Sequence, residues 1–521
     1  MNKAAFSVVA AGAVVLGLAL RLGWLDLRPM HHDEANQAVR FGQLLETGEY
    51  RYDRNDHHGP TLYYLTLPVA WARGQTTLAS LDERTLRLVP ALFGAGFILL
   101  LPLMARGLGR GAVAAAMLLA ALSPALTYYT RFYIQESVLL FFVVGFLVAL
   151  GRYAAGGGVA AMIAAGVCAG LALATKETAA PILLAGVVAC AAARASVASP
   201  GGATGERAAV PWPRIRVGHA VGGLAVAALV AVTLFSSFFT NLSGVADAVR
   251  AGAVYAQRGF APGTHGERWD YYLRLLGYSS SGGLVWTEGL VLVLAGVGAV
   301  LAWTKRAGGF WPRYVCLYSV ITLVAFSAVR YKTPWNLLPF YGGVVALAGF
   351  GGARLVGLTR SRTARALLAI VLLAACGRLA FQTWLANFKY PADPRNPYVY
   401  AQTSPDFLRL VTRVTGVSSV HPNRERMLVA VVAGPYEQWP LPWYLRRMER
   451  VGYWTSVAEV GPLDRMPFIV AAPDLADAVA ASLGDRYVSE YYGLRPGVLL
   501  TVFIERGLWD RFMAHSDPFS R

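Results

Sequence analysis

Two long apolar runs with a short basic connection between them decide the fold of this chain: residues 86–130 read LRLVPALFGAGFILLLPLMARGLGRGAVAAAMLLAALSPALTYYT. A helix of about 20 apolar residues is long enough to cross the ~30 Å hydrocarbon core of a bilayer. Each run meets that length, and the connection RGLGR suits a turn at a membrane surface. We therefore expect a helical hairpin embedded in a membrane.

The same pattern recurs along the first three quarters of the chain. With 56% hydrophobic and only 15% charged residues, the 521-residue chain is too apolar for a set of soluble domains. The first run has Lys3 in front but no small-residue cleavage site behind, so we interpret it as a retained helix and not a signal peptide. We predict eleven spans, at residues 4–26, 86–105, 111–130, 135–151, 157–174, 178–194, 218–240, 283–303, 313–329, 335–353 and 366–386.

The distribution of basic residues orients these spans. The net charge of +17 does not indicate nucleic-acid binding, because the basic residues lie in short connections between apolar runs and form no basic patch. With the N-terminus inside, the inside connections hold fifteen basic residues against one acid, Glu206. The positive-inside rule therefore predicts an N-in, C-out topology.

The composition changes after the last span, at Lys389. We expect a transmembrane domain over 1–386 and an extracytoplasmic α/β domain over 387–521. In the second domain, short runs rich in β-forming residues alternate with amphipathic stretches. The expected strands are 427–434, 467–472 and 498–504, and the expected helices are 406–415 and 474–483.

Reactive residue types gather in four segments that this topology places on the outside face. The segments are His31–Glu34, Tyr128–Glu136, Thr175–Thr178 and Arg330–Asn336. Carboxylates beside cations at a membrane face suit a ligand with a lipid tail and a phosphate head. The cations hold the phosphate and stabilise it as a leaving group, while a carboxylate activates an incoming hydroxyl. The chain has no Walker loop, Rossmann fingerprint or HExxH motif, so we do not expect a soluble nucleotide donor.

Each segment also has a structural interpretation. Asp33 and Glu34 are suitable as a general base with a neighbouring partner, or they simply begin a solvated loop. Arg131 among tyrosines is typical of an interfacial aromatic belt as well as of a phosphate contact. The Lys176–Glu177 pair is either a surface ion pair or a site that needs a compact ammonium, in a chain that otherwise prefers arginine.

A divalent metal ion is a further alternative for the first outside loop, 27–85. Imidazole and carboxylate ligands suit zinc or manganese, but the spacing matches no established motif. The candidate ligands are His31, His32, Asp33, Asp56, His57 and His58.

Taken in order, these segments resemble the GT-C glycosyltransferase superfamily, which includes protein O-mannosyltransferases and the lipid A aminoarabinose transferase. The resemblance rests on Asp33-Glu34 after the first span, on the Tyr-Tyr-x-Arg-Phe hairpin around Arg131, and on Thr-Lys-Glu at 175–177. More narrowly, the chain is similar to the prokaryotic flippase-activity-associated family over nearly its whole length. The segments that carry this similarity are His32–Ala35, Leu44–Gly48, His58–Tyr64, Tyr331–Trp335 and Pro440–Leu445.

The resemblance implies transfer of a sugar from a polyprenyl-phosphate carrier, with inversion at the anomeric carbon, on the extracytoplasmic side. Asp33 would be the general base and Glu34 would shape the acceptor or sugar site. The residues expected to bind substrate are His58, Arg131, Glu136, Lys176, Glu177, Tyr331 and Lys332. The hairpin ends here in Gln135-Glu136, where the narrower family favours an aspartate or a similar acid, so the role of Glu136 is the point at which the chain departs from the pattern.

The resemblance also implies a multi-pass protein of the inner (plasma) membrane that serves cell-envelope glycosylation. Its partners would be the polyprenyl-phosphate sugar, a lipid, glycan or protein acceptor, and membrane lipids, with no nucleic acid. The alternatives are a component of a lipid-linked glycan flippase without transferase activity, and a non-catalytic scaffold. The segment Trp439–Tyr444, followed by Arg446 and Arg447, predicts that the C-terminal domain covers the site and helps to select the acceptor.

Overall fold

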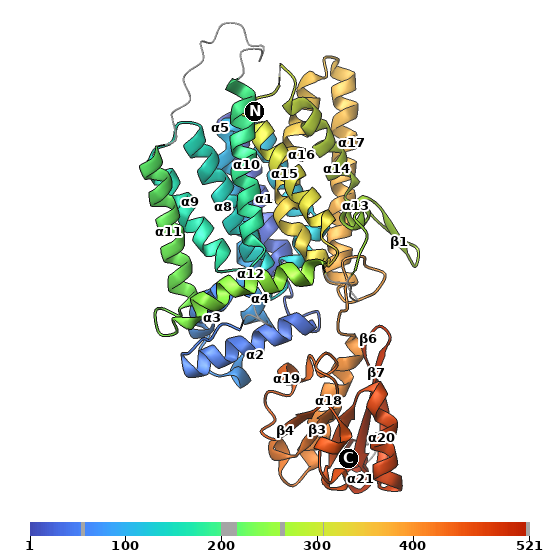
Figure 1. Cartoon of the computed structure of the whole chain (residues 1–521). Coiled ribbons are helices and arrows are strands. Elements are labelled where there is room, and N and C mark those ends of the chain that lie inside the picture. The colour runs from blue at the N-terminus through green and yellow to red at the C-terminus, as the bar shows by residue number, and fades with distance from the viewer. Residues whose placement is uncertain (54–57, 199–215, 261–265, 306, 517–521) are drawn as a thin grey trace.

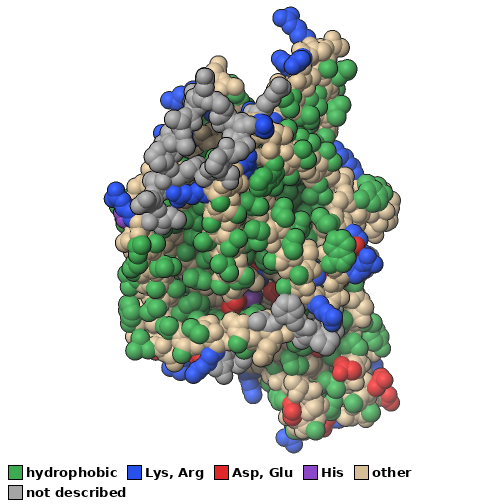
Figure 2. All heavy atoms as spheres, turned by 45° about the horizontal axis from the view of Figure 1, so that its top comes forward, with side chains coloured by type: hydrophobic (Ala, Val, Ile, Leu, Met, Phe, Trp, Pro, Cys, Tyr) green, Lys and Arg blue, Asp and Glu red, His purple; other side chains and the backbone are tan. Residues whose placement is uncertain are grey.

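A bundle of long helices forms most of the molecule, and a smaller sheet domain lies beyond one end of it (Figure 1). The computed structural model describes residues 1–53, 58–198, 216–260, 266–305 and 307–516. The N-terminus lies at the end of the bundle opposite the C-terminal domain, as the predicted N-in, C-out topology requires. Figure 2 shows hydrophobic side chains over most of the flank of the bundle, which is the surface that a bilayer would cover.

Every predicted apolar run forms a helix, which confirms a polytopic α-helical fold. Eight helical segments among the described residues are long and apolar enough to cross a membrane, and α6, α9 and α14 are shorter. The helices of the bundle are α1 (Lys3–Leu22), α4 (Glu83–Leu100), α6 (Arg110–Leu122), α8 (Glu136–Ala154), α9 (Val159–Leu173), α10 (Ala179–Ala198), α11 (Val217–Phe235), α14 (Gly289–Ala302), α15 (Phe310–Ala328), α16 (Leu338–Leu358) and α17 (Arg362–Trp384).

The predicted span 111–130 is broken into two helices. Helix α6 ends at Leu122, and a separate helix α7 (Pro124–Tyr129) follows. Proline has no backbone N–H to donate into a continuing helix, and it is favoured at the first helical position. Ser123 caps the new helix by accepting a hydrogen bond from Leu126 N at 3.2 Å. The prediction of one continuous helix was therefore wrong at Pro124.

Glycines allow two spans of the bundle to approach each other closely. A methyl group built on Gly351 of α16 would lie 2.0 Å from the carbonyl oxygen of Leu294 in α14. One built on Gly298 of α14 would lie 2.3 Å from the carbonyl oxygen of Leu347 in α16. Small residues at a helix crossing are the usual means of close packing in a membrane, where lipid offers no hydrophobic driving force between helices.

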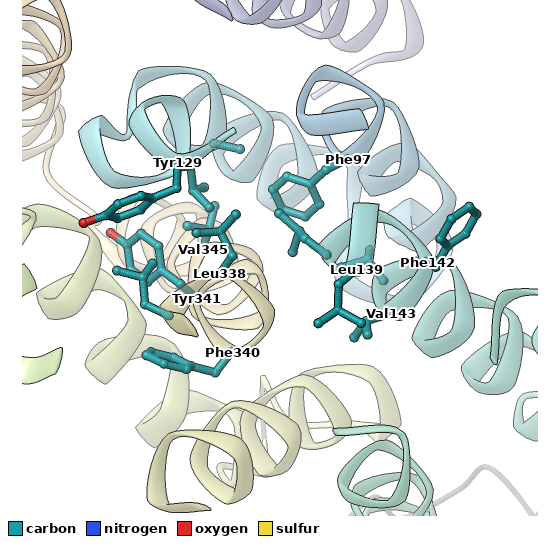
Figure 3. Close-up of a cluster of buried hydrophobic side chains, with 14 of the residues drawn as sticks. Phe97, Tyr129, Leu139, Phe142, Val143, Leu338, Phe340, Tyr341 and Val345 are labelled. Carbon is teal, nitrogen blue, oxygen red and sulfur yellow. The ribbon is translucent and has the colours of Figure 1, made fainter. Parts of the chain in front are cut away.

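Large apolar side chains fill the bundle interior, and tyrosines close it near the C-terminal domain. Figure 3 shows the rings of Phe97 and Phe340 among aliphatic side chains, with the hydroxyl groups of Tyr129 and Tyr341 pointing in the same direction. Both tyrosines are buried. The Tyr129 hydroxyl donates to the carbonyl of Tyr398 at 3.0 Å, so the core is tied to the chain segment that follows α17.

Several helices lie at the end of the bundle that faces the C-terminal domain. The sequence predicted only connections between spans there. The outside segment 27–85 contains α2 (His32–Thr47) and α3 (Thr61–Ala72), and 241–282 contains α12 (Ser243–Phe260) and α13 (Tyr271–Gly277). In Figure 1, α2 and α12 run across the bundle end, roughly perpendicular to the spans. A small hairpin of β1 (Ser279–Ser281) and β2 (Leu284–Trp286) precedes α14.

The C-terminal domain is a five-stranded mixed sheet with helices, which confirms an α/β fold there. The strand order is β4-β3-β5-β7-β6. Strands β4 and β5 pair in parallel with β3, whereas β7 pairs antiparallel with β5 and β6. Three strands and two helices were predicted: β3 (Val429–Val432), β5 (Phe468–Ala471), β7 (Val498–Glu505), α18 (Pro405–Val420) and α20 (Pro473–Leu483). The elements not predicted are β4 (Val451–Trp454), β6 (Tyr487–Arg495), α19 (Leu441–Tyr444) and α21 (Arg506–Ser516).

Helix α19 and the residues after it dock the C-terminal domain on the bundle end. Trp443 Nε1 donates to the Glu83 carboxylate at 2.8 Å, and Arg446 donates to the Leu81 carbonyl at 2.7 Å. The Tyr444 hydroxyl accepts from Met30 N at 2.8 Å. Arg446 therefore serves the contact between the two parts, and it does not reach a substrate headgroup as the sequence suggested.

The contact between α14 and α16 generates a stability test. Gly351→Ala should lower the free energy of unfolding by ~1–3 kcal/mol, because the added methyl group meets a backbone carbonyl that cannot move aside. Gly296→Ala in α14 is the matched control, since a methyl group there has no neighbour within 4 Å. Thermal unfolding in detergent, followed by labelling of the buried thiols of Cys190 and Cys316, measures both variants. Equal melting temperatures for the two variants would contradict the packing argument.

Candidate functional site

Asp33 presents an accessible carboxylate at the N-terminal end of α2. His31 caps this helix: its Nδ1 accepts from Asp33 N at 3.1 Å, and its own N–H donates to Glu34 Oε2 at 3.0 Å. The Asp33 side chain is 43% exposed, and its carboxylate lies 3.9 Å from His31 Nδ1. No hydrogen bond to this carboxylate is formed by any residue that the structure describes. Asp33 is therefore in a position to accept a proton from a ligand.

Glu34, the adjacent acid, is fully buried and anchors α2 to the bundle. Its two oxygens accept from Arg87 Nε and Nη2, both at 2.7 Å, and Oε1 also accepts from Tyr133 N at 2.8 Å. Burial by itself raises the pKa of Glu34, but the Arg87 charge and hydrogen bonds outweigh it and lower the pKa to about 2. With no open acceptor position, Glu34 supports the site structurally and does not contact the acceptor or sugar as the sequence suggested.

Arg131 is committed to the end of the first span. Its guanidinium donates to the carbonyl oxygens of Leu20 at 2.8 Å, Arg21 at 3.2 Å and Trp24 at 3.0 Å. These carbonyls are among those that a helix C-terminus leaves without an internal partner. The guanidinium also lies over the Phe388 ring at 4.9 Å. Arg131 therefore closes α1, and its expected contact with the donor phosphate stays a prediction.

Lys176 lies in a buried polar contact between three parts of the bundle. Its ammonium group forms an ion pair with Glu136, the first residue of α8, and donates to Asn336 Oδ1 at 3.2 Å. Both members of the ion pair are almost completely buried. The second oxygen of Glu136 is buried and has no hydrogen-bond partner among the described residues.

Glu177 holds His58 in place beside this ion pair. One Glu177 oxygen accepts from the Tyr52 hydroxyl at 2.8 Å, and the other lies 2.8 Å from His58 Nδ1. Burial tends to raise the pKa of Glu177, but the contacts with His58 and Tyr52 lower it overall. The two loops are packed closely, because a methyl group on Gly59 would lie 2.1 Å from the Ala174 carbonyl oxygen. His58 thereby keeps Nε2 for another partner.

Lys332 bonds to backbone in place of a carboxylate. Its ammonium group donates to the carbonyl of Glu267 at 3.1 Å and to that of Val329. Burial lowers the pKa of Lys332, because the ammonium ion is partly removed from water. The neighbouring Tyr331 forms a backbone bridge to Gly266 and is 42% exposed. Tyr331 and Lys332 border the site. Two of the three ammonium N–H groups of Lys332 donate to the Glu267 and Val329 carbonyls, which leaves the third for another acceptor.

Trp335, in the short helix η3 (Pro334–Leu337), joins the two halves of the site. Its ring centroid lies 5.4 Å from that of His31 and 5.7 Å from that of Tyr400. His31 is the N-cap of α2, and Asn336, the residue after Trp335, accepts from Lys176. Trp335 and Asn336 thus connect the first turn of α2 to the buried ammonium group.

The histidines of the first loop do not form the proposed metal site in the described part of the chain. His31 uses both ring nitrogens, since Nε2 contacts the Tyr400 carbonyl at 3.0 Å and Nδ1 accepts from Asp33 N. Among the described residues, no group of three His, Cys, Asp or Glu side chains is arranged to hold a metal ion. The candidate ligands Asp56 and His57 lie outside the described residues.

Sequence reasoning missed Glu288, a buried acid that ties the bundle to the segment leading to the C-terminal domain. Its carboxylate accepts from the Ser123 hydroxyl at 2.9 Å and from Ala125 N at 2.8 Å. The hydroxyl groups of Tyr341 and Tyr398 also donate to it. Two acids inside predicted spans, Glu136 and Glu288, were signals that a fixed polar contact lies at the bundle end.

Comparisons with known proteins agree with this architecture. Residues 66–205 match the family model described as dolichyl-phosphate-mannose-protein mannosyltransferase. No curated protein sequence matches the chain. In fold, the chain is similar to ArnT from Cupriavidus metallidurans, solved bound to undecaprenyl phosphate, at 17% identity and a TM-score of 0.60; the match covers 98% of this chain and 99% of that one.

Two further solved structures share the fold. The archaeal oligosaccharyltransferase AglB from Archaeoglobus fulgidus, in complex with an inhibitory peptide and a dolichol-phosphate, matches at 12% identity and a TM-score of 0.56, over 95% of this chain and 74% of that one. The arabinofuranosyltransferase AftD from Mycobacteria matches at 14% identity and a TM-score of 0.50, over 97% of this chain and 40% of that one.

The Glu34–Arg87 ion pair generates a second stability test. Arg87→Ala should lower the free energy of unfolding by ~3–5 kcal/mol, because it leaves a buried carboxylate without its counter-charge. In the wild type the pKa of Glu34 is lowered. Its full contribution to the free energy of unfolding is therefore present at pH values above 4.5, its ordinary pKa, and is lost as the pH falls toward 2. In the variant, burial without Arg87 raises the pKa of Glu34, so the variant loses stability as the pH rises above the ordinary value, and the difference from wild type should grow with pH.

Arg84→Ala, one turn earlier in α4, is the matched control for Arg87→Ala. Arg84 pairs with Asp26 at 2.8 Å, but its side chain is exposed, so its loss should have a much smaller effect. Chemical unfolding in micelles at several pH values measures both variants. Equal losses of stability would show that the buried pair does not anchor α2.

Proposed function

We propose that the chain is a glycosyltransferase of the GT-C type, which transfers a sugar from a polyprenyl-phosphate carrier to a hydroxyl group of a lipid, glycan or protein acceptor; the match of residues 66–205 to the mannosyltransferase model and the three similar folds support this proposal. One observation carries the proposal: the accessible Asp33 carboxylate follows His31, whose ring contacts Trp335, and the buried Lys176 ammonium group donates to Asn336, the residue next to Trp335. The ligands of two similar folds, undecaprenyl phosphate in ArnT and a dolichol-phosphate in AglB, support this donor class.

Asp33 is the general base of the proposed reaction. It takes the proton from the acceptor hydroxyl as the oxygen attacks the anomeric carbon, and the bond from that carbon to the phosphate oxygen breaks. The electron pair leaves with the polyprenyl phosphate, and attack from the opposite face inverts the anomeric carbon. Asp33 lies in the first turn of α2 with its side chain partly exposed, so an acceptor hydroxyl can reach its carboxylate.

Lys176 stabilises the leaving phosphate as a compact cation. Its ion pair with Glu136 holds the ammonium group in a buried position. His58, oriented by Glu177, is placed to offer Nε2 to the same phosphate. Tyr331 and Lys332 border this region, and Lys332 adds a second ammonium group.

The proposed reaction takes place on the extracytoplasmic face of the inner (plasma) membrane. Short in-plane helices and the C-terminal domain occupy the end of the bundle that carries Asp33. The N-terminal end and the basic connections belong to the opposite, cytoplasmic side by the positive-inside rule. We propose a transfer that does not depend on a metal ion or depends on it only weakly, since the steps above are assigned to Asp33, Lys176 and His58.

Asp33→Asn tests the proposed base directly. The variant should lower the rate of sugar transfer by about 10²–10⁴-fold, because the amide keeps the shape but cannot accept the proton. Binding of undecaprenyl phosphate should remain, since Asp33 does not contact the phosphate. Asp26→Asn, at an exposed ion pair on the same end of the bundle, is the control and should keep its activity.

The measurement is turnover of the purified full chain in nanodiscs with a panel of polyprenyl-phosphate sugars. Undiminished turnover in Asp33→Asn would disprove the role of this residue. If the wild-type protein transfers none of the sugars but moves a lipid-linked glycan between leaflets, the flippase alternative replaces the proposal.

Lys176→Arg tests the phosphate contact while conserving the charge. The forked guanidinium is larger than an ammonium group and cannot act as a point donor in this buried space, so we expect at least an about tenfold weaker affinity for undecaprenyl phosphate. Lys389→Arg, an exposed lysine at the same end of the bundle, is the matched control. Equal affinities of both variants, measured by native mass spectrometry in nanodiscs, would remove Lys176 from the donor site.

A further inference from the structure

Three aromatic rings from both parts of the molecule meet beside Asp33. The ring centroid of His32, the first residue of α2, lies 6.1 Å from that of Tyr436 and 6.1 Å from that of Trp439. Tyr436 and Trp439 belong to the loop that follows β3 of the C-terminal domain. We call these three residues the aromatic platform. It lies next to the proposed general base, because Asp33 is the neighbour of His32 in the first turn of α2.

The topology of the sheet makes this loop a favoured place for a ligand. Strand β3 is the centre of the parallel part, with β4 on one side and β5 on the other. The chain therefore goes from β3 to β4 and then crosses back to β5, which creates a switch point at the carboxyl end of β3. Ligands of open α/β sheets bind outside the carboxyl ends of the strands at such a point, and residues 433–440 form the loop there.

Tyr436 is the exposed member of the platform, at 70%, whereas His32 and Trp439 are partly buried. The Tyr436 ring therefore offers an accessible face next to two supported rings. Arg495 of β6 holds the loop by donating to the Tyr436 carbonyl at 3.3 Å and to Glu437 Oε1 at 3.4 Å. Helix α19, directly after the loop, is docked on the bundle through Trp443 and Glu83. The rings are therefore held near Asp33 before any ligand binds.

The chemistry of the loop selects among ligands. Residues 433–440 read AGPYEQWP, so the single charged side chain is an acid, Glu437. The loop itself has no lysine or arginine; Arg495, which contacts it from β6, is paired with Glu437, and Arg446 is engaged by the Leu81 carbonyl, so an anionic headgroup would have to displace an existing contact. Flat aromatic faces with a carboxylate and the Gln438 amide at the rim suit a neutral ring that has one apolar face and several hydroxyl groups.

We propose that the aromatic platform is the acceptor subsite and binds a neutral pyranose ring, so that the acceptor of this chain is a glycan. The inference rests on the proposed transferase function and deepens it. The apolar face of the sugar stacks on Tyr436 and Trp439, Glu437 accepts hydrogen bonds from its hydroxyl groups, and one hydroxyl is left toward Asp33. A charged lipid headgroup and a peptide are the competing acceptors.

A binding experiment tests the platform without any need for activity. Saturation-transfer difference NMR on the full chain in nanodiscs measures contact with mannobiose, cellobiose and N,N′-diacetylchitobiose. We expect a signal from at least one disaccharide in the wild type and in Tyr436→Phe, and its loss in Tyr436→Ala. Tyr491→Ala is the matched control, because Tyr491 is 63% exposed on β6, the strand at the far edge of the same sheet.

Each possible result of this experiment either supports or overturns the inference. Absence of every disaccharide signal, an equal signal in Tyr436→Ala, or a Tyr436-dependent signal from a serine-containing peptide or an anionic lipid headgroup would overturn the inference. Once the turnover assay has identified a transferred sugar, Tyr436→Ala should raise the acceptor KM by about three- to tenfold and leave kcat and donor affinity unchanged. An unchanged acceptor KM would overturn the subsite while the transferase stands. Tyr436-dependent sugar binding in a protein that transfers nothing would support the subsite and reject the transferase.

Discussion

The buried ion pair between Glu34 and Arg87 is the constraint on which the site depends. Arg87 lies within a membrane-spanning helix and directs all three guanidinium nitrogens toward the segment between the first span and α2. Its hydrogen bonds to Glu34 and to the carbonyls of Leu25, Arg28 and Pro29 fix where α2 begins. Because successive residues of a helix point about 100° apart, burying Glu34 turns Asp33 toward the surface.

That geometry also explains how far the sequence could predict the site. The long apolar runs and their basic connections predicted the bundle, since bilayer thickness and charge asymmetry leave a strong signal in composition. The two adjacent acids were recognised as important, but nothing local distinguishes the buried one from the exposed one. The distinction comes from Arg87, which is distant in sequence and hidden in an apolar run.

Arg131 and Lys176 show the same limit for cations. Both were expected to face the donor phosphate. Arg131 satisfies carbonyls at the end of α1, a demand created by a helix terminus that the sequence does not locate to within a residue. Lys176 meets Glu136 and Asn336 from two other outside segments, and only the folded bundle brings these together. Helices α2 and α12, which run across the end of the bundle, were not predicted, because the segments 27–85 and 241–282 were interpreted as connections between spans.

The way the C-terminal domain is seated has a consequence for how such proteins diversify. Much of the docking uses backbone groups of the bundle. Arg446 donates to the Leu81 carbonyl, and the Met30 N–H donates to the Tyr444 hydroxyl. The hydrogen bond from Trp443 to Glu83 joins two side chains. Backbone groups are present whatever the sequence. The loops at the carboxyl ends of the strands can therefore vary in sequence while the docking contacts are kept. Evolution could in this way change which acceptor is bound near Asp33 without changing the transmembrane domain.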